Sequence, residues 1–297
     1  MIGGYITMID VIIIGAGPAG VSAALYVKAR GKNVLLLEKD KIGGLIANVS
    51  KVSHYLSLDK DETGPSFAKK LADQLAQAQI PVHYEEVLSL KKEDPGFLVQ
   101  TSQDSYRAEK VICASGSSLK DLPLRQEEEI PYHHWPLGQE DQVKGKIVLM
   151  NGGSDGACKE ALYLAKYAKE VHIIQVQEDL LCIHEFRERI EQSPNIFVHT
   201  SAQLESVKVK DGLCLEASFA GQVVQDPQGL EIYVQIGQNG NTGYLKDLAN
   251  LEGSFVKEDL ASSLQGLYFA GDLRVKAVKQ VATAVSDGCL AGIQACK

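Results

Sequence analysis

The sequence predicts an α/β protein with two domains of similar design, the second inserted into the first. A buried strand runs into a glycine turn and a helix at residues 10–29, and the same order returns at residues 147–165. A short strand ending in Gly-Asp at residues 266–272 then precedes a helix of small residues at 280–296. Because strands that alternate with helices form parallel sheets, we expect two Rossmann-like domains of the three-layer ββα type.

The first glycine turn has the residues that a dinucleotide needs. Three glycines follow the strand with the spacing Gly-x-Gly-x-x-Gly, namely Gly15, Gly17 and Gly20. They permit a tight turn, a close approach of the backbone to a pyrophosphate and close helix packing, and the helix N-terminus favours the phosphate charge. Glu38 ends the next apolar strand, 18 residues after Gly20, where its carboxylate would accept hydrogen bonds from a ribose. The alternative is a glycine-rich turn that binds nothing, and the strand, helix and acid at these positions argue against it.

The rest of the first domain continues with a helix and short strands. Phe67, Leu71 and Leu75 recur every fourth residue, which predicts a helix from about residue 65 with one buried face. Strands are expected at residues 86–90 and 97–101, joined by a turn at Asp94-Pro95-Gly96. An apolar strand at residues 111–114 then enters Ser115-Gly116.

The second glycine turn is altered. It follows the strand Ile147–Met150, reads Asn-Gly-Gly-Ser-Asp-Gly-Ala, and precedes a helix and a strand at 171–174. Counted from the strand, Asn151 replaces the first glycine; counted back from the helix, Ser154 replaces the third. One glycine is missing in either register, and a Cβ atom there would crowd a pyrophosphate. Residues 126–143, rich in Glu, Gln and Pro, are expected to connect the two domains.

The C-terminal segment is expected to complete the first domain. Asp272 ends a short strand, where its carboxylate could bond the hydroxyls of a ribityl chain. Backbone amides at Gln280 and Val281, at a helix N-terminus, could meet the electron-rich edge of a flavin. We therefore assign residues 1–116 and 244–297 to a discontinuous FAD-binding domain, and residues 117–243 to the inserted domain.

Composition and charge exclude several classes of protein. The 297 residues are 45% apolar and 23% charged, with a net charge of −8, so we expect no nucleic-acid partner and no membrane partner. No apolar run reaches membrane-spanning length, and the leader Met1–Met8 does not read as a secretory signal, which predicts a cytoplasmic protein. The six cysteines form no Cys-x-x-Cys pair and no Cys/His zinc spacing, so we expect no metal. A disulfide between distant cysteines stays open.

Together these segments resemble the low-molecular-weight thioredoxin reductases, which are FAD enzymes of the pyridine nucleotide-disulphide oxidoreductase superfamily. The resemblance covers nearly the whole chain in order, and its motifs are Gly15–Gly20, Glu38, Gly43-Gly44, Ala114–Gly116, Glu160–Leu164, Ile236–Thr242, Phe269–Asp272 and Gln280–Ala284. It implies an FAD domain split around a second Rossmann-like domain, and a homodimer. It also implies a set of FAD-binding residues, namely Gly15, Gly17, Pro18, Ala19, Gly20, Glu38, Lys39, Gly43, Gly44, Ala114, Gly116, Gly271, Asp272, Gln280 and Val281.

The first departure from the family concerns the redox dithiol. Family members that reduce thioredoxin carry Cys-x-x-Cys just before the second Rossmann strand, whereas this chain reads Tyr132-His133-His134-Trp135-Pro136-Leu137-Gly138 there. A dithiol is needed to accept reducing equivalents from a flavin and pass them on by exchange. Unless distant cysteines substitute, we therefore do not expect thioredoxin reduction by the family route.

The second departure concerns the nicotinamide coenzyme. The family places His-Arg-Arg and a further Arg after the second strand of the inserted domain, and these cations grip the 2′-phosphate of NADPH. This chain has Gln175-Val176-Gln177 and Leu181 at those positions. NADH would require an acid at residue 175. We expect weak or absent binding of both NADPH and NADH; the alternative is that NADH binds with altered geometry.

Four residues are weak candidates for catalysis, and no catalytic residue is assigned. His133, His134 and Trp135 stand where the family dithiol would be, so a histidine could handle a proton and the indole could stack on a flavin. His54 falls where family members often carry Asn near the flavin. The simpler interpretation is an ordinary loop, because lone histidines are mostly structural or exposed.

Three functions agree with these observations. The first is an FAD oxidoreductase that receives electrons from a protein such as ferredoxin or flavodoxin instead of NADPH. The second is a ferredoxin–NAD(P)H reductase of the thioredoxin-reductase-like type, although those enzymes normally keep the nucleotide motifs and extend beyond the last helix. The third is a flavin-binding sensor or interaction module without catalysis. The inserted domain could also hold a different nucleotide, even a second FAD.

Overall fold

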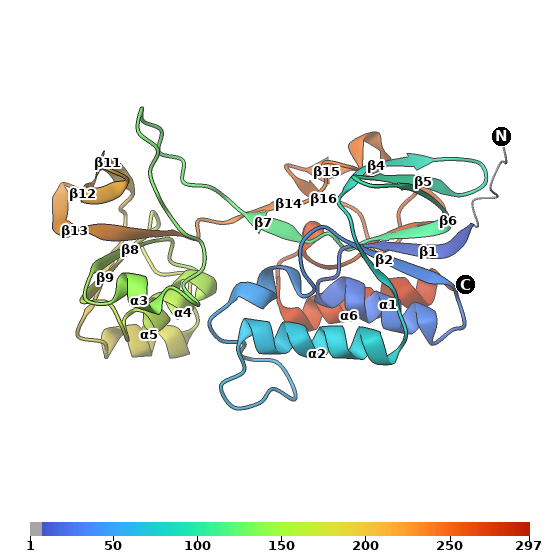
Figure 1. The fold of residues 1–297 in the computed structure, drawn as a ribbon, viewed down its shortest axis with the longest axis horizontal. Coiled ribbons are helices and arrows are strands. Elements are labelled where there is room, and N and C mark those ends of the chain that lie inside the picture. The colour runs from blue at the N-terminus through green and yellow to red at the C-terminus, as the bar shows by residue number, and fades with distance from the viewer. Residues whose placement is uncertain (1–7) are drawn as a thin grey trace. The chain divides into compact units, whose positions relative to one another are not determined.

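The computed structural model describes residues 8–297, so residues 1–7 of the predicted leader lie outside the described part. The chain forms two compact units. The first unit comprises residues 8–48, 52–118 and 239–297, and the second unit comprises 49–51 and 119–238. These bounds differ by a few residues from the predicted domain bounds, and the binding roles of the domains stay a prediction. Each unit is described separately below (Figure 1).

The first unit is built on one mixed sheet. Its strands run in the order β3 (Val82–Tyr84), β2 (Val34–Glu38), β1 (Ile9–Ile14), β6 (Ser105–Cys113), β5 (Phe97–Thr101) and β4 (Val87–Lys92), with β17 (Leu267–Phe269) also paired to β6. Strands β3, β2, β1, β6 and β17 are parallel to their neighbours, whereas β4, β5 and the first half of β6 form an antiparallel meander. The last strand of the chain therefore completes the sheet that the first strand begins.

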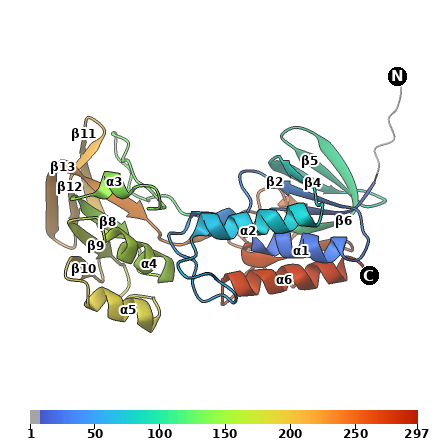
Figure 2. The same ribbon diagram turned by 60° about the horizontal axis from the view of Figure 1, so that its bottom comes forward.

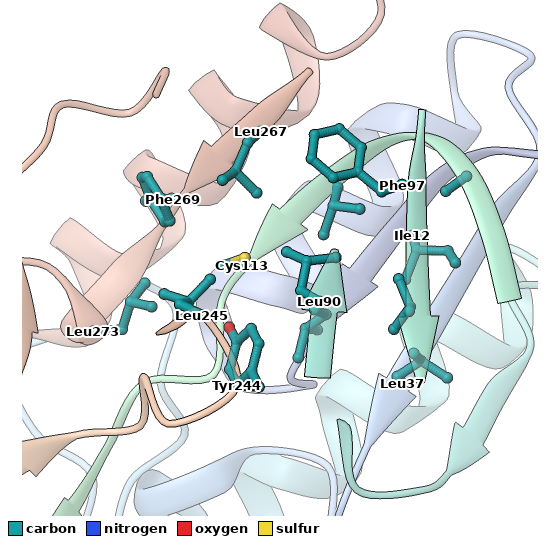
Figure 3. Packing of buried hydrophobic residues seen from close by; sticks show 14 of the residues in the cluster. Ile12, Leu37, Leu90, Phe97, Cys113, Tyr244, Leu245, Leu267, Phe269 and Leu273 are labelled. Carbon is teal, nitrogen blue, oxygen red and sulfur yellow. The ribbon is translucent and has the colours of Figure 1, made fainter. Parts of the chain in front are cut away.

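Helices cover one face of this sheet, and an apolar layer covers the other. The helices are α1 (Pro18–Lys28), α2 (Gly64–Gln77) and α6 (Val281–Gln294), with 3₁₀ turns at Gly44–Asn48, Lys246–Leu248 and Gly271–Leu273 (Figures 1 and 2). A Cβ atom on Gly288 of α6 would lie 2.0 Å from the Ala19 carbonyl oxygen, so α1 and α6 approach to backbone contact. On the other face, Ile12 and Leu37 of the parallel strands pack with Leu90 and Phe97 of the meander (Figure 3).

The second unit repeats this topology. Its sheet has the order β10 (Ile196–His199), β9 (Glu170–Ile174), β8 (Ile147–Asn151), β13 (Gln222–Val234), β12 (Leu213–Phe219) and β11 (Leu204–Lys210), and its helices are α3 (Glu140–Val143), α4 (Asp155–Leu164) and α5 (His184–Glu191). The long strand β13 is the counterpart of β6, because its end pairs parallel with β8 and its start pairs antiparallel with β12. The predicted α/β fold class and the internal repeat are confirmed.

Short strands account for the remaining elements. Strands β7 (Ser117–Leu119) and β14 (Gln238–Gly240) pair where the chain leaves the first unit and where it returns, and β15 (Leu251–Glu252) pairs with β16 (Phe255–Val256). In residues 8–297 there is no helix whose length and hydropathy would let it cross a membrane.

Candidate functional site

The glycine turn of the first unit is shaped by contacts between backbone atoms. Gly15 has a φ of +102°, and a Cβ atom on it would lie 2.5 Å from the Ala114 carbonyl oxygen. The Gly15 N–H donates to the Leu37 carbonyl at 2.7 Å, which ties the turn to β2. A Cβ atom on Gly20 would lie 1.8 Å from the Gly15 carbonyl oxygen. Only glycine fits at these two positions, because α1 rests directly on the turn.

Gly17 differs from its neighbours because nothing in the protein crowds it. It is the N-cap of α1, with Pro18 as the first helical residue, and the nearest atom to a Cβ on Gly17 would be the Gly43 carbonyl oxygen at 3.9 Å. Gly43 donates to the Ala16 carbonyl at 2.8 Å, and Gly44, with a φ of +59°, lies beside the Gly17 Cα. A helix N-terminus therefore opens between bare backbone segments, which suits an anionic group.

Glu38 is fixed at the end of β2 by backbone donors. Its Oε2 accepts from the Ala16 N–H at 2.7 Å and its Oε1 from the Asp40 N–H at 2.9 Å, and the residue is only 8% exposed. Each carboxylate oxygen keeps a further lone pair for a hydroxyl donor. The adjacent Lys39 is exposed. The turn and the acid predicted from their spacing are thus brought together.

The third predicted segment also meets the turn. Gly271, with a φ of +80°, lies so close to α1 that a Cβ atom on it would be 2.8 Å from the Ala19 Cβ. Asp272 follows, and its Oδ1 is buried without a hydrogen-bond donor. Burial raises the pKa of this carboxyl, and Lys276 and Lys279 offset part of that effect. An orphaned buried acceptor beside an open helix N-terminus is suited to a hydroxyl donor of a ligand.

A charged cluster around Asp287 supports this segment, and the sequence reasoning missed it. The Asp287 Oδ2 accepts from the Gly271 N–H at 3.0 Å, from Arg274 at 3.2 Å and from Lys276 at 3.2 Å. The Lys276 Nζ also lies 3.6 Å from the Asp272 Oδ1. Three cations within residues 274–279 stand close to the Gly-Asp motif in sequence, and this run of positive charge was the available signal.

The remaining predicted positions in the first unit lie at its loop ends. Gln280 is the N-cap of α6, Val281 is its first residue, and the Gln280 N–H donates to the Thr283 hydroxyl at 3.1 Å. Gly116, with a φ of +63°, accepts from the Asn241 N–H at 3.0 Å through its carbonyl. His54 is exposed in a loop of the first unit with a φ of +58°.

In the second unit the structure corrects the predicted register of the glycine turn. Gly152, not Asn151, corresponds to Gly15: it has a φ of +122°, a Cβ on it would lie 2.2 Å from the Gln235 carbonyl oxygen, and its N–H donates to Ile174 at 2.9 Å. The strand-based count failed because β8 continues through Asn151, one residue beyond the predicted end of the strand at Met150. Ser154 is the N-cap of α4 and therefore occupies the place of Gly17.

The position equivalent to Glu38 is Gln175. This residue follows Ile174 as Glu38 follows Leu37, it is only 5% exposed, and its Nε2 donates to the Asp179 carbonyl at 3.3 Å. Val176 is 61% exposed and Leu181 is 63% exposed, so apolar side chains stand where the family has cations.

One cation near this turn escaped the sequence reasoning. Arg187 reaches back from α5, where its guanidinium donates to the Leu180 carbonyl at 2.6 Å and lies 3.7 Å from the Asp179 carboxylate. It comes from a helix beyond the family motif, so its position in the sequence gave no signal.

The histidines that replace the family dithiol are held within the second unit. The His133 Nε2 lies 3.1 Å from the Gln142 amide and 3.6 Å from the Glu231 carboxylate, and its ring packs on Tyr233. The His134 Nδ1 lies 2.7 Å from the Val234 carbonyl oxygen. Trp135 follows them, half-buried. These contacts suit structural side chains, and none of them assigns a reaction to the histidines. Within residues 8–297 there is no group of three His, Cys, Asp or Glu side chains arranged to hold a metal ion.

Two Rossmann-like units of one topology, each opening with a strand, a glycine turn and a helix, define a two-domain nucleotide-dependent class of protein. Residues 9–288 match the pyridine nucleotide-disulphide oxidoreductases, so the chain belongs to this family. Within the family it is similar to thioredoxin reductases. It is 27% identical to the thioredoxin reductase of Peptoclostridium acidaminophilum over 96% of this chain and 95% of that protein.

Other relatives agree with this similarity. The chain is 29% identical to NADPH-dependent thioredoxin reductase 3 of Arabidopsis thaliana, with 96% of this chain aligned, but it spans only 57% of the length of that protein. The solved structure of T. acidophilum thioredoxin reductase is matched with a TM-score of 0.90 at 29% identity, over 97% of both chains. Lactococcus lactis thioredoxin reductase, in its FR conformation, is matched with a TM-score of 0.90 at 25% identity, also over 97% of both chains.

Proposed function

We propose that this protein is an FAD-dependent oxidoreductase that receives its electrons from a one-electron protein donor, such as ferredoxin or flavodoxin, and not from NADPH. The observation that carries the proposal is the contrast between the two glycine turns. The first turn keeps an uncrowded Gly17 and the acid Glu38, whereas the second has Ser154 and the buried amide of Gln175 at the same places.

The residues of the first unit fit FAD. The open backbone at Gly17 and Gly44 gives a pyrophosphate room next to the N-terminus of α1. Glu38 would accept from the adenosine ribose. The orphaned Oδ1 of Asp272 would accept from a ribityl hydroxyl, which removes the cost of a buried acceptor without a donor.

Bound FAD supplies the redox chemistry, because a flavin accepts and releases electrons singly or in pairs. The protein contributes binding, orientation and charge. The first amides of α6, with Lys276 and Lys279 close in sequence, supply positive charge for an electron-rich ring edge. As the family resemblance implies, Gly116 and the residues after it would lie along the part of the site that holds the flavin.

The second turn offers a nicotinamide coenzyme fewer favourable contacts. The Ser154 Cβ stands at the helix N-cap, where a pyrophosphate approaches most closely in such folds. The exposed residues Val176 and Gln177 provide no positive charge for a 2′-phosphate. The segment Tyr132–Gly138 contains no cysteine, so the electrons must leave by a route other than the family dithiol.

Anaerobic reduction of the yellow protein tests the proposal. NADPH, NADH, reduced ferredoxin and reduced flavodoxin are each mixed rapidly with the protein while flavin absorbance is followed. Reduced rubredoxin is added to the panel because one relative, 26% identical, is named a 34.2 kDa protein in the rubredoxin operon of Clostridium pasteurianum. We expect bleaching by at least one protein donor and not by either nucleotide. Bleaching by NADPH or NADH within milliseconds would refute the proposed electron donor. A colourless protein that cannot be reconstituted with FAD would refute the proposed FAD dependence.

Arg187 favours a second candidate, a ferredoxin–NAD(P)H reductase. Its guanidinium lies near the altered turn, and a 2′-phosphate could compete for it with the Leu180 carbonyl. In that case NADPH would reduce the flavin and Arg187→Gln would slow that reduction.

We also propose a homodimer, by resemblance to the family, which light scattering of the purified protein tests directly.

A further inference from the structure

Two cysteines of the second unit lie next to each other although they are far apart in sequence. Cys158 is in the first turns of α4 and is fully buried, whereas Cys182 is half-buried in the loop between β9 and α5. Both thiols are free, and Cys182 packs against the apolar cluster of the second unit to which Cys158 belongs. A disulfide between them would require their Cα atoms to lie about 4.4–6.8 Å apart, so the backbone around both residues decides whether it can form.

The loop that carries Cys182 is pinned on both sides of the cysteine. The Leu181 N–H donates to the Gly153 carbonyl at 2.8 Å, and Leu181 forms a β-bridge with Ser154. The Ile183 N–H donates to the Asp155 carboxylate at 2.8 Å. The Cys158 Sγ itself lies 3.5 Å from the Gly153 carbonyl oxygen. The backbone therefore holds Cys182 beside the start of α4, and the Gly153 carbonyl meets both the Cys158 sulfur and the residue before Cys182.

We propose that Cys158 and Cys182 form a reversible disulfide when the protein meets hydrogen peroxide, with Cys182 as the reacting thiol and Cys158 as the resolving thiol. The inference rests on the contacts within the second unit and does not depend on the proposed function of the flavin site.

Accessibility and charge distinguish the two roles. Cys182 is the thiol that solvent reaches, and a peroxide attacks an accessible thiolate. Burial, followed by the neighbouring Cys182 and Asp155, raises the pKa of Cys158, and Arg187 lowers it to a smaller extent. The thiolate form of Cys158 is therefore disfavoured, and Cys182 is the thiol that reacts first.

The reaction balances in two steps. The Cys182 thiolate attacks the peroxide, so that an S–O bond forms, the O–O bond breaks and hydroxide leaves to become water. The Cys158 sulfur then attacks the Cys182 sulfur, so that the S–S bond forms, the S–O bond breaks and a second water leaves with the Cys158 proton. Two thiols lose two electrons and two protons, and hydrogen peroxide is reduced to two waters. A dithiol reductant reverses the change.

The other cysteines have different surroundings. Cys113 is buried against Tyr244, and burial raises its pKa to about 12. Cys214 lies with its Sγ 3.7 Å from the Pro131 carbonyl oxygen, and Cys289 is near Tyr26, whose pKa it raises. Cys289 is half-exposed and serves as a matched control, because it is accessible like Cys182 but faces a tyrosine.

The test uses the full-length protein, reduced, freed of reductant and exposed to hydrogen peroxide before denaturation and alkylation with a maleimide. Trypsin separates the two cysteines into residues 147–159 and 170–187, because Lys159 lies between them. We expect a cross-linked pair of these peptides, two fewer maleimide labels per chain, and recovery of both labels after dithiothreitol. In the oxidised protein the Leu181 amide should exchange its hydrogen about tenfold more slowly, since the cross-link restrains local opening.

Variants assign the roles. Cys182→Ser should abolish the cross-link, and because this side chain is half-buried the change should leave the fold intact. Cys158→Ser should leave a sulfenic acid on Cys182 that dimedone captures, and Cys289→Ser should cross-link like the original chain. The proposal is overturned if peroxide oxidises Cys289 while Cys158 and Cys182 both stay free, or if Cys182 is oxidised without the cross-link in the unsubstituted protein.

Discussion

The two glycine turns of this molecule have the same backbone and different side chains. In both, a glycine with positive φ ends the first strand and would collide with a neighbouring carbonyl if it had a Cβ, at 2.5 Å for Gly15 and 2.2 Å for Gly152. In both, that glycine donates to the strand alongside. The two turns differ where a ligand would lie: Gly17 corresponds to Ser154, and Glu38 corresponds to Gln175.

This difference separates what a fold requires from what a ligand requires. Gly15 and Gly152 are needed because backbone meets backbone there, so both units have them. Nothing in the protein requires a glycine at Gly17, whose missing Cβ would meet no atom closer than 3.9 Å. The room at Gly17 suits a bound group, and the serine at the same place in the second unit leaves less room there.

The largest expected effect is at Gly20. In Gly20→Ala the new Cβ would lie 1.8 Å from the Gly15 carbonyl oxygen, so α1 must move away from the turn. We expect a loss of about 3 kcal/mol in the free energy of unfolding, as overpacking of a close contact produces, and no bound flavin. Urea unfolding and the flavin content per chain measure the two effects.

Two other glycines serve as controls for this change. Gly243→Ala meets no atom within 4 Å and should change the free energy of unfolding by less than about 0.5 kcal/mol. Gly17→Ala should keep the fold but lose flavin, because only the ligand occupies that space. If Gly17→Ala bound flavin as tightly as the original protein, the comparison between the turns would be wrong.

A second set of substitutions would give the second turn the glycine and the cations that the family has there. Val176→Arg with Gln177→Arg, on a Ser154→Gly background, places two guanidinium groups on exposed positions. Since a charge-assisted hydrogen bond contributes about 1.5–3 kcal/mol, we expect NADPH affinity to rise at least about tenfold. Isothermal titration checks this.

NADH distinguishes a specific gain from a general one. It lacks the 2′-phosphate, so its affinity should rise less than that of NADPH. Val223→Arg, an exposed substitution on β13 of the same unit, should change neither affinity. Equal gains for both coenzymes would mean that the missing cations are not what weakens the second turn.

The third prediction concerns the orphaned carboxylate. Asp272→Asn should raise the free energy of unfolding of the flavin-free protein by about 1 kcal/mol, because it removes a buried charge whose pKa is raised by burial. The same variant should bind flavin about tenfold more weakly, since it loses a charge-assisted acceptor. Thermal unfolding of the flavin-free protein measures the expected gain in stability, and flavin titration measures the expected loss of affinity.

The pH dependence of that variant follows from the same shift. The folded pKa of Asp272 lies above its unfolded value of 3.8, so its destabilising effect is complete above the folded pKa and disappears as the pH falls below 3.8. The advantage of Asp272→Asn should therefore vanish in acid. The exposed Asp259→Asn should show no such advantage at any pH.

The smallest predicted effect concerns acid and the second unit. The His172 Nδ1 lies 3.0 Å from the His199 Nε2, and the two rings are stacked. Burial lowers the pKa of His172, and Glu170 opposes this effect; burial and His172 lower that of His199. Because the unfolded state takes up protons at a higher pH than the folded state, the free energy of unfolding should fall as the pH drops below about 6.5.

Hydrogen exchange between pH 7.5 and 5 locates this effect. Amides of β9 and β10 should lose protection on acidification, more than those of β1 and β2. His172→Phe, which keeps the ring stack but cannot be protonated, should reduce the pH dependence, and the exposed His184→Gln should leave it unchanged. Equal losses in both units would rule out the histidine pair as the cause.

Much of this molecule followed from local sequence. Strand, glycine turn and helix are short-range patterns, since a buried apolar run and the glycines after it are adjacent in the chain. The helix with Phe67, Leu71 and Leu75 on its buried face was likewise predictable from its period, and so were the internal repeat and the absence of a Cys-x-x-Cys pair.

Contacts between distant segments were not predictable in this way. The register of the second turn depended on the Gln235 carbonyl, which β13 brings against Gly152 from far along the chain. Asp287 holds Gly271 from the middle of α6, and Arg187 reaches Leu180 from α5. The sequence by itself determined the class of fold and the chemistry available at each turn, because propensity and spacing are local. Only the tertiary structure decided which glycine meets which carbonyl, which carboxylate lacks a donor and which two cysteines share one apolar cluster, because packing alone brings those atoms together.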